Sequence, residues 1–370
     1  MTGRLAAKEL ARDEELGIIH KRVTLPDATS FESPSRSLSS PMEQTSQPIV
    51  NEIPRIILDV TINALETGTL SLHREIRSKF VRGAFNLTMF DLRLTKFPGV
   101  KDVRTLAEHL YSSSDSTVFL PSVKSGMLKE SGAEREEATN RVVARLSTKR
   151  LQQYVQMQEQ IIDEIEAVHN RKPIVGIIPL MPIKFSRQIL ELYFKKGIEA
   201  FAIDALNKDI LSNEPDFRLI LSDIHQYKPL SEVLIYACNL GYPQFEKNRA
   251  RADDFLSLFA YVDVLGSTFR SRGGPMNYEG FRPEPRAKLF SRTQYSYEIS
   301  TYDQASQKLG VRATPRIVKN FNQRVQLIES DSVRQLIGKK SVKAYVSSKA
   351  AVDQYSLSKL ESIARGVPPR

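Results

Sequence analysis

Residues 174–206 read IVGIIPLMPIKFSRQILELYFKKGIEAFAIDAL, and this stretch decides the fold class. A run of β-branched and apolar residues is followed by an amphipathic helical pattern, and then by a second apolar run that ends near Asp204. Strand, helix and strand in this order form a βαβ unit, in which the two strands lie parallel. Because both runs are apolar throughout, we expect helices to cover both faces of the sheet.

Similar patterns continue on either side of this unit. We expect further strands at Ile56–Ile62, Thr117–Val123, Phe217–Leu221, Val233–Asn239 and Tyr261–Leu265. We expect helices at Val103–Tyr111, Arg135–His169, Ser186–Lys196 and Arg251–Ala260. An open doubly wound sheet and a closed α/β barrel both fit this alternation. The absence of a Gly-rich dinucleotide fingerprint, together with polar residues after several strands, favours a (β/α)8 TIM-type barrel with its site at the carboxyl ends of the strands.

The sequence divides into three parts. Residues 1–50 comprise a short charged helix over 1–22 and a Ser/Pro-rich arm over 25–49, which could order against the barrel or against a second subunit. Residues 51–270 are expected to form the barrel. Residues 271–370 are expected to form a basic, mostly helical extension packed on it, without strands. Its helical patterns cover Tyr302–Leu309, Arg316–Gln335 and Lys349–Ile363.

The composition excludes several classes of protein. Hydrophobic residues make up 41% of the 370 residues and charged residues 26%, values typical of a globular protein with a core. No apolar stretch approaches the length of a membrane helix, and the amino terminus has no secretory apolar segment. The single cysteine, Cys238, and five scattered histidines indicate no disulfide and no metal centre. We therefore expect a cytoplasmic protein with no cofactor and no membrane partner.

The positive charge is concentrated in the last hundred residues. Residues 271–370 contain 18 Lys and Arg against eight Asp and Glu, whereas residues 1–270 contain 35 of each. This excess indicates a nucleic-acid partner, tRNA or DNA, although it would also suit a merely solubilising surface. Candidate phosphate- and base-binding residues are the basic residues of this segment and its start, which alternate with aromatic residues: Arg270, Arg272, Arg282, Arg286, Lys288 and Arg292. The alternatives are a flexible loop around 271–274 and aromatic side chains that pack inward.

Three segments also resemble a known family. KPIVGIIPLM through AFAIDAL, then VLIYACNLGYP over 233–243 and YVDVLGS over 261–267, are similar in order and spacing to tRNA-guanine transglycosylases. The resemblance covers about residues 115–346. It departs from the family pattern at key positions, because Gly266 stands where the family has its nucleophilic Asp and Lys124 stands where it has an Asp before Ser-Gly. The cysteines that hold the family's zinc are absent, and Asn320 or Phe321 replaces its histidine.

This resemblance implies base exchange on a purine of 7-deazaguanine type in tRNA or DNA. Such a reaction needs a carboxylate that attacks the anomeric carbon and a group that moves a proton. Asp204 and Asp263 are the candidate carboxylates, with Asp223 as a weaker third, and Lys124 could hold a phosphate or act as an amine. The segment 239–243 supplies three candidate base-binding residues: Asn239, Gly241 and Tyr242.

Each candidate also has a structural alternative. Asp204 could cap the following helix, and Asp263 could be a buried residue bonded to the backbone. Lys124 could be a solvent-facing loop residue, and the 239–243 segment a turn. Three functions therefore stay open: a divergent glycosyltransferase that exchanges a base, a non-catalytic nucleic-acid-binding paralogue or subunit of a base-modification system, and an unrelated barrel enzyme acting on a small phosphorylated substrate. Homo- or hetero-oligomers are compatible with all three.

Overall fold

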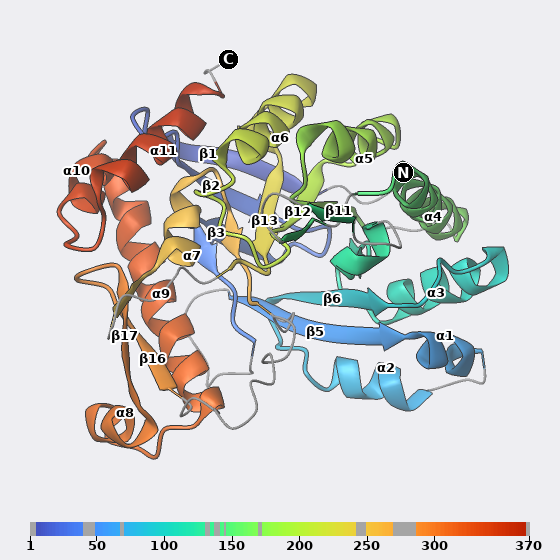
Figure 1. Cartoon of the computed structure of the whole chain (residues 1–370), viewed down its shortest axis with the longest axis horizontal. Helices are drawn as coiled ribbons and strands as arrows, with labels where there is room; N and C mark the ends of the chain where they lie inside the picture. The colour runs from blue at the N-terminus through green and yellow to red at the C-terminus, as the bar shows by residue number, and fades with distance from the viewer. Residues whose placement is uncertain are drawn as a thin grey trace.

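The computed structural model describes residues 5–39, 49–66, 70–129, 134–136, 141–143, 146–168, 172–241, 249–268 and 286–367. In these residues the chain forms an α/β protein (Figure 1). Parallel strands occupy the centre, helices α3 to α6 lie outside them, and the C-terminal helices lie along one side. None of the helices in these residues combines the length and apolarity that a membrane span requires.

The largest sheet has six parallel strands in the order β4-β15-β13-β12-β11-β7. Their bounds are Ser35–Arg36 (β4), Val264–Leu265 (β15), Leu234–Cys238 (β13), Ala200–Asp204 (β12), Ile174–Pro179 (β11) and Val118–Phe119 (β7). The predicted strands at 174–181, 200–206 and 233–239 are thereby confirmed. The strand predicted at 117–123 is two short strands, β7 and β8 (Ser122–Val123), and only Val264–Leu265 of the strand predicted at 261–265 is extended. Strands β12 and β13 are buried along their whole length, as parallel strands covered on both faces must be.

A second parallel sheet has the order β5-β6-β8, formed by Val50–Leu58, Phe85–Arg93 and Ser122–Val123. The predicted strand at 56–62 was therefore displaced: the strand begins at Val50, and α1 begins at Asp59. Two features link the sheets. Only two residues separate β7 from β8, and Leu38, just after β4, pairs in parallel with Asn51 of β5.

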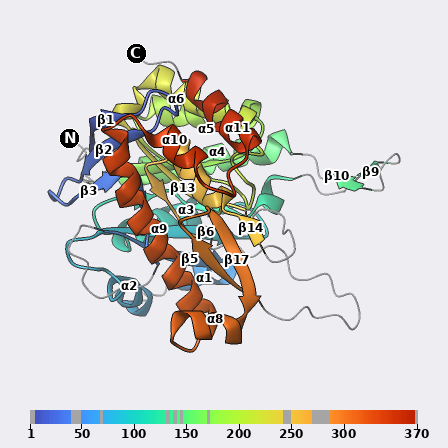
Figure 2. The same cartoon turned by 90° about the vertical axis from the view of Figure 1, so that its left-hand side faces the viewer.

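Helices follow most of the parallel strands. They are α1 (Asp59–Leu65), α2 (Leu70–Arg77), α3 (Val100–Ser112), α4 (Thr148–Ala167), α5 (Ile183–Lys195), α6 (Glu214–Tyr227) and α7 (Asp253–Leu256). The predicted helices at 103–111 and 186–196 are confirmed. The helix predicted from 135 begins only at Thr148, because β9 (Glu134–Glu136) and β10 (Arg141–Val143) form a hairpin that extends away from the other strands (Figure 2). The strand predicted at 217–221 was wrong, since Phe217, Leu221 and Ile224 are one buried face of α6.

The described part of the predicted charged helix over 1–22 forms two strands, so that prediction was wrong. An antiparallel sheet contains β1 (Ala6–Arg12), β2 (Ile19–Thr24) and β3 (Ser30–Ser33). In β2 the burial alternates, with Lys21 and Val23 buried and Arg22 exposed, which is the period of a strand. Because Lys21 is charged but lies on the buried face, the sequence does not show the alternation of apolar and polar residues that is typical of a strand. The predicted arm at 25–49 contains β3 and β4.

The C-terminal region contains a hairpin besides its helices, so the prediction that strands stop after residue 270 was wrong. The hairpin strands are β16 (Arg286–Ser291) and β17 (Ser296–Thr301), and β17 also pairs with β14 (Arg249–Arg251). The helices are α8 (Tyr302–Leu309), α9 (Pro315–Ile337), α10 (Val342–Ser347) and α11 (Gln354–Arg365). Phe290, Tyr295 and Tyr297 are buried and contact Phe255 or one another, so the alternative of inward-packed aromatics is confirmed for these three.

Candidate functional site at the ends of two parallel strands

A cavity of about 260 Å³ opens between helix α9 and the carboxyl ends of β4 and β15. Arg36 ends β4, and Gly266 and Ser267 follow β15. The hairpin β16–β17 supplies a second wall. In Figure 1, α9 lies between this hairpin and the central strands, so the C-terminal region forms one side of the cavity. Carboxyl ends of parallel strands are where α/β proteins place their sites.

Four cationic side chains line this cavity, from three elements: Arg36, Arg286, Lys288 and Lys319. Arg36 is only 8% exposed and is fixed by two hydrogen bonds to side chains. Its Nε donates to Oε1 of Gln326 at 2.8 Å, and one of its terminal nitrogens donates to Oγ of Ser37 at 3.2 Å. A guanidinium held in this way keeps a fixed direction, so it can receive an anion without first being ordered.

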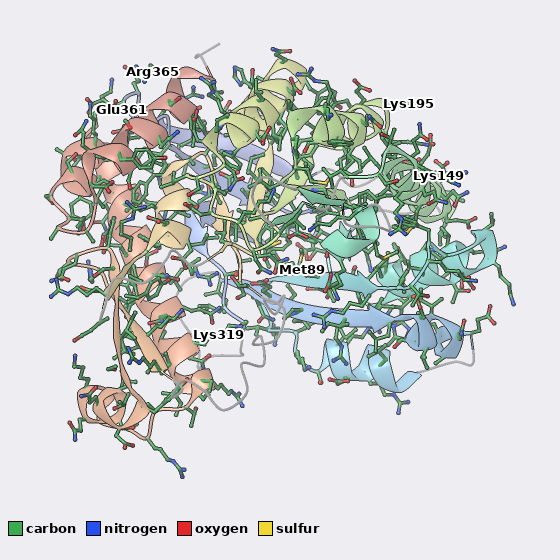
Figure 3. The ribbon with its side chains drawn as sticks, viewed as in Figure 1. Met89, Lys149, Lys195, Lys319, Glu361 and Arg365 are labelled. Carbon is green, nitrogen blue, oxygen red and sulfur yellow. The ribbon has the colours of Figure 1, made fainter. Side chains whose placement is uncertain are left out.

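No described residue accepts a hydrogen bond from the ammonium of Lys319. It is half-buried on α9, on the side that faces the central strands (Figure 3). Burial lowers the pKa of Lys319, the charge of Glu52 raises it, and the charge of Arg36 lowers it again, with a net lowering. A lysine with a lowered pKa in a cavity is a candidate functional group.

Asp254 brings a carboxyl group to the same cavity. Its Oδ2 accepts a hydrogen bond from the Tyr297 hydroxyl at 2.6 Å, and its Oδ1 has no partner among the described residues. The same hydroxyl accepts from Nε2 of Gln326 at 2.8 Å, so Arg36, Gln326, Tyr297 and Asp254 form one directed chain of hydrogen bonds. Burial raises the pKa of Asp254, although the bond from Tyr297 and the charge of Arg36 oppose that shift.

Glu52 lies next to this cavity and is only 1% exposed. Its Oε2 accepts the hydroxyl of Ser37 at 2.7 Å and the backbone amide of Ser267 at 2.8 Å. Ser267 in turn accepts from Nε2 of Gln323 on α9 at 2.9 Å. The buried carboxylate therefore connects β5, the end of β4 and the segment after β15.

Asp204 ends β12, and Asn239 and Gly241 follow β13, but none of these three predicted residues lines the cavity. Oδ1 of Asp204 accepts from the amide of Leu206 and from Nδ2 of Asn239, both at 3.0 Å. A Cβ atom on Gly241 would lie 2.4 Å from the carbonyl oxygen of Asn207. These close contacts suit a tight turn, which was the structural alternative for this segment.

Asp263 falls within the strand predicted at 261–265, but in the structure it precedes β15, which begins at Val264. Its carboxylate accepts from Nζ of Lys21 at 2.7 Å, from the amide of Ile235 at 2.8 Å and from the hydroxyl of Ser33 at 2.8 Å. These bonds lie at the amino ends of β13 and β15. Asp263 therefore has the buried, backbone-bonded setting that was its alternative.

The other candidates are scattered. Lys124 is exposed after β8 and lies outside the cavity lining. Asp223 lies in α6, not at a strand end, and pairs with Arg187 at 2.9 Å. Arg292 pairs with the buried Glu329 at 2.9 Å. Four predicted residues lie outside the described residues: Tyr242, Arg270, Arg272 and Arg282.

Gly266, the position matched to the family nucleophile, has no room for a side chain. A Cβ atom there would lie 2.1 Å from the hydroxyl oxygen of Tyr236 and 2.9 Å from the carbonyl oxygen of Ala237. Tyr236 is fully buried, so its ring has little freedom to move aside. An aspartate at this position would require the strand ends to rearrange.

The sequence reasoning missed Arg36, Glu52, Asp254 and Lys319. One signal was present, because polar residues recur along α9 at helical spacing: Lys319, Gln323, Gln326 and Ser330. Spacings of four, three and four place them on one face, and the last three of them are buried. A polar stripe on the buried face of a helix indicates a site or a polar network.

The chain matches no family model, and no curated protein matches its sequence. The similarity to transglycosylases therefore stays a prediction. Among the described residues, no group of three or more His, Cys, Asp or Glu side chains is arranged to hold a metal ion.

Proposed function

We propose that the parallel strands form one closed (β/α)8 barrel. Eight strand segments would follow one another around it in chain order: β4, β5, β6, β7 with β8, β11, β12, β13 and β15. Support comes from the parallel pairing of β8 with β6, of β7 with β11 and of β15 with β4. The parallel bridge between Leu38, just after β4, and Asn51 of β5 would make β4 and β5 neighbours in the barrel.

We further propose that the protein binds nucleic acid across the carboxyl ends of these strands. The observation that supports it is the cavity lined by four cationic side chains. The surrounding segment 286–324 contains eight Lys and Arg but only two Asp and Glu. Backbone phosphates supply most of the affinity of a protein for nucleic acid, and clustered Lys and Arg are the groups that bind them.

The cavity volume limits what can enter. A space of about 260 Å³ suits a single sugar-phosphate unit, so a nucleotide would reach it only after leaving the base stack. The proposal is thus a barrel that holds one displaced nucleotide in the cavity, with neighbouring phosphates on Arg286 and Lys288. This matches the non-catalytic binding hypothesis most closely, since neither Asp204 nor Asp263 lines the cavity.

Base exchange on a purine is a second candidate, and one observation favours it. Glu52 is a buried carboxylate that accepts the amide of Ser267, the residue directly after Gly266. It therefore brings a carboxylate close to the position where the family carries its nucleophile. Release of guanine from tRNA or DNA that is lost in Glu52→Gln, and retained in Asp204→Asn and Asp263→Asn, would support this assignment. No release by the unaltered protein would remove it.

The binding proposal is tested by titrating the full chain with tRNA, single-stranded DNA and duplex DNA at two salt concentrations. We expect the double variant Arg286→Ala, Lys288→Ala to bind more weakly, with the salt dependence reduced by about 0.7–0.9 per lost phosphate contact. The matched control is Lys149→Ala, Lys195→Ala, which removes the same charge far from the cavity (Figure 3). Equal losses in both variants, or no binding to any of the three nucleic acids, would refute the proposal.

A further inference from the structure

Lys319 has no hydrogen-bond acceptor among the residues that the structure describes. A lysine ammonium has three N–H donors, and partly buried ammonium groups normally use them. Lys21 illustrates this, because its Nζ donates to Asp263 and to two backbone carbonyls. No described residue accepts a hydrogen bond from Lys319, although the side chain is half-buried in the cavity.

The surroundings of Lys319 lower the pKa of its amine. Burial lowers the pKa of its amine, and the nearby charge of Arg36 lowers it further, against the opposing charge of Glu52. A neutral amine carries the lone pair that attacks a carbonyl carbon, whereas an ammonium does not. Desolvation and a neighbouring cation are the two means by which proteins prepare a nucleophilic lysine.

A proton donor lines the same cavity. Burial raises the pKa of Asp254, which favours the protonated acid, and Oδ1 of this residue has no partner among the described residues. The hydroxyl of Tyr297 holds the other oxygen at 2.6 Å, and Gln326 holds that hydroxyl at 2.8 Å. Asp254 is therefore oriented by Tyr297, and it lines the cavity, where its carboxyl group can exchange a proton with a ligand.

We propose that Lys319 forms an imine with the aldehyde of a phosphorylated sugar bound in this cavity, and that Asp254 supplies the proton that the reaction needs. The amine nitrogen attacks the aldehyde carbon, the carbonyl oxygen takes up a proton and the nitrogen loses one. Asp254 then protonates the resulting hydroxyl group, which leaves as water while the carbon–nitrogen double bond forms. No oxidant or reductant is consumed. Arg286 and Lys288, which line the same cavity, are the groups that would hold the phosphate.

A phosphorylated sugar aldehyde can come from two sources. One is a free pentose phosphate, and the other is the ring-opened sugar that remains in a nucleic-acid strand after a base has been removed. The second source rests on the proposed function, since it requires the strand to bind across the cavity. The imine chemistry is the same for both.

Sodium borohydride tests the proposal because it reduces an imine irreversibly to a secondary amine. The full chain is incubated with an oligonucleotide that contains one base-free deoxyribose, or separately with ribose 5-phosphate, and borohydride is then added. We expect a covalent adduct with at least one of them, and roughly a tenfold or greater loss of adduct in Lys319→Arg, which keeps the charge but cannot form the imine. Lys339→Arg, an exposed lysine beyond the end of α9, is the control and should react as the unaltered chain does.

Asp254→Asn should slow adduct formation roughly 10²-fold or more without removing it. Peptide mapping of the reduced adduct must place the modification on Lys319, which keeps the test valid even if Lys319→Arg folds poorly. No adduct with either probe, or adducts spread over surface lysines, would overturn the proposal. Binding of an intact oligonucleotide without borohydride is measured in parallel, so that a failure of the proposed function is distinguished from a failure of the imine chemistry.

Discussion

The ammonium of Lys21 lies 2.7 Å from the carboxylate of Asp263, although 242 residues separate them in the chain. Both side chains are 2% exposed. Burial lowers the pKa of Lys21 and raises that of Asp263, and the attraction between them opposes both shifts. Lys21 also donates to the carbonyls of Leu230 and Val233, which precede β13. One side chain thus joins the N-terminal sheet to the amino ends of two parallel strands.

We predict that Lys21→Met destabilises the protein by about 3–5 kcal/mol, because it leaves the Asp263 carboxylate buried and unpaired. The double variant Lys21→Met, Asp263→Asn should lose less stability than the single variant, since it leaves no unpaired charge buried. Urea unfolding measures both, and Lys8→Met on the exposed face of β1 is the control. A double variant less stable than Lys21→Met alone would show that the charge is not the cause.

Gly266 offers a second test. We predict that Gly266→Ala costs about 1–3 kcal/mol, because the new methyl group would meet the hydroxyl of Tyr236 and the carbonyl oxygen of Ala237. Gly266→Asp should cost more, so restoring the family residue should damage the fold. Gly338→Ala is the matched control, since no atom lies within 4 Å of its Cβ position, and it should stabilise by about 0.4–1 kcal/mol. A Gly266→Ala midpoint equal to that of the unaltered chain would contradict the predicted clash.

The sequence predicted the parallel strands that are uniformly apolar and missed those that carry polar residues. Strand β6 was not predicted, because Asn86 and Thr88 interrupt its apolar run. Both are buried, and both are satisfied by distant partners: Asn86 bonds Asn51, and Thr88 bonds the carbonyl of Ser113. A buried polar residue is tolerated when it is hydrogen-bonded, and those bonds depend on tertiary neighbours that periodicity does not reveal.

The candidate cavity was less predictable than the fold for the same reason. Arg36, Asp254 and Lys319 come from three distant segments, and each carries a local pattern of its own: a Ser-rich arm, a helix start and an amphipathic helix. Hydrogen bonds through Gln326 and Tyr297 connect Arg36 to Asp254, and Lys319 joins them only by lining the same cavity. The basic residues Arg286 and Lys288 were predicted, because charge density is visible in a sequence without any knowledge of contacts.

Asp253 should make the protein more stable as the pH falls. Burial, with the charge of Asp209, raises the pKa of Asp253 to about 6, above its ordinary value of 3.8. Between these two values the folded state holds a proton that the unfolded state has lost, so acidification favours folding there. Asp253→Asn should remove this gain, on the order of 2–3 kcal/mol between pH 6 and pH 4, as measured by urea unfolding at each pH. A variant with the pH dependence of the unaltered chain would exclude a raised pKa at Asp253.

His109 should make the protein less stable as the pH falls. It is 3% exposed, its ring contacts His73 and Phe90, and neither ring nitrogen has a hydrogen-bond partner among the described residues. Burial, reinforced by the charges of His73 and Arg55, lowers the pKa of His109 from 6.5 to about 4. Between pH 6.5 and pH 4 the unfolded state binds a proton at His109 that the folded state does not bind. The stability of the protein therefore falls as the pH drops through this range.

We therefore predict that His109→Leu becomes more stable relative to the unaltered chain as the pH is lowered, by on the order of 3 kcal/mol between pH 7 and pH 4. In the unaltered chain, the contributions of His109 and Asp253 to the pH dependence of stability nearly cancel, because the two groups titrate over overlapping pH ranges with opposite signs. Asp253→Asn should consequently expose the acid sensitivity of His109, and His109→Leu should expose the acid stabilisation by Asp253. If both single variants and the double variant keep one common pH profile, neither group has the buried environment described for it.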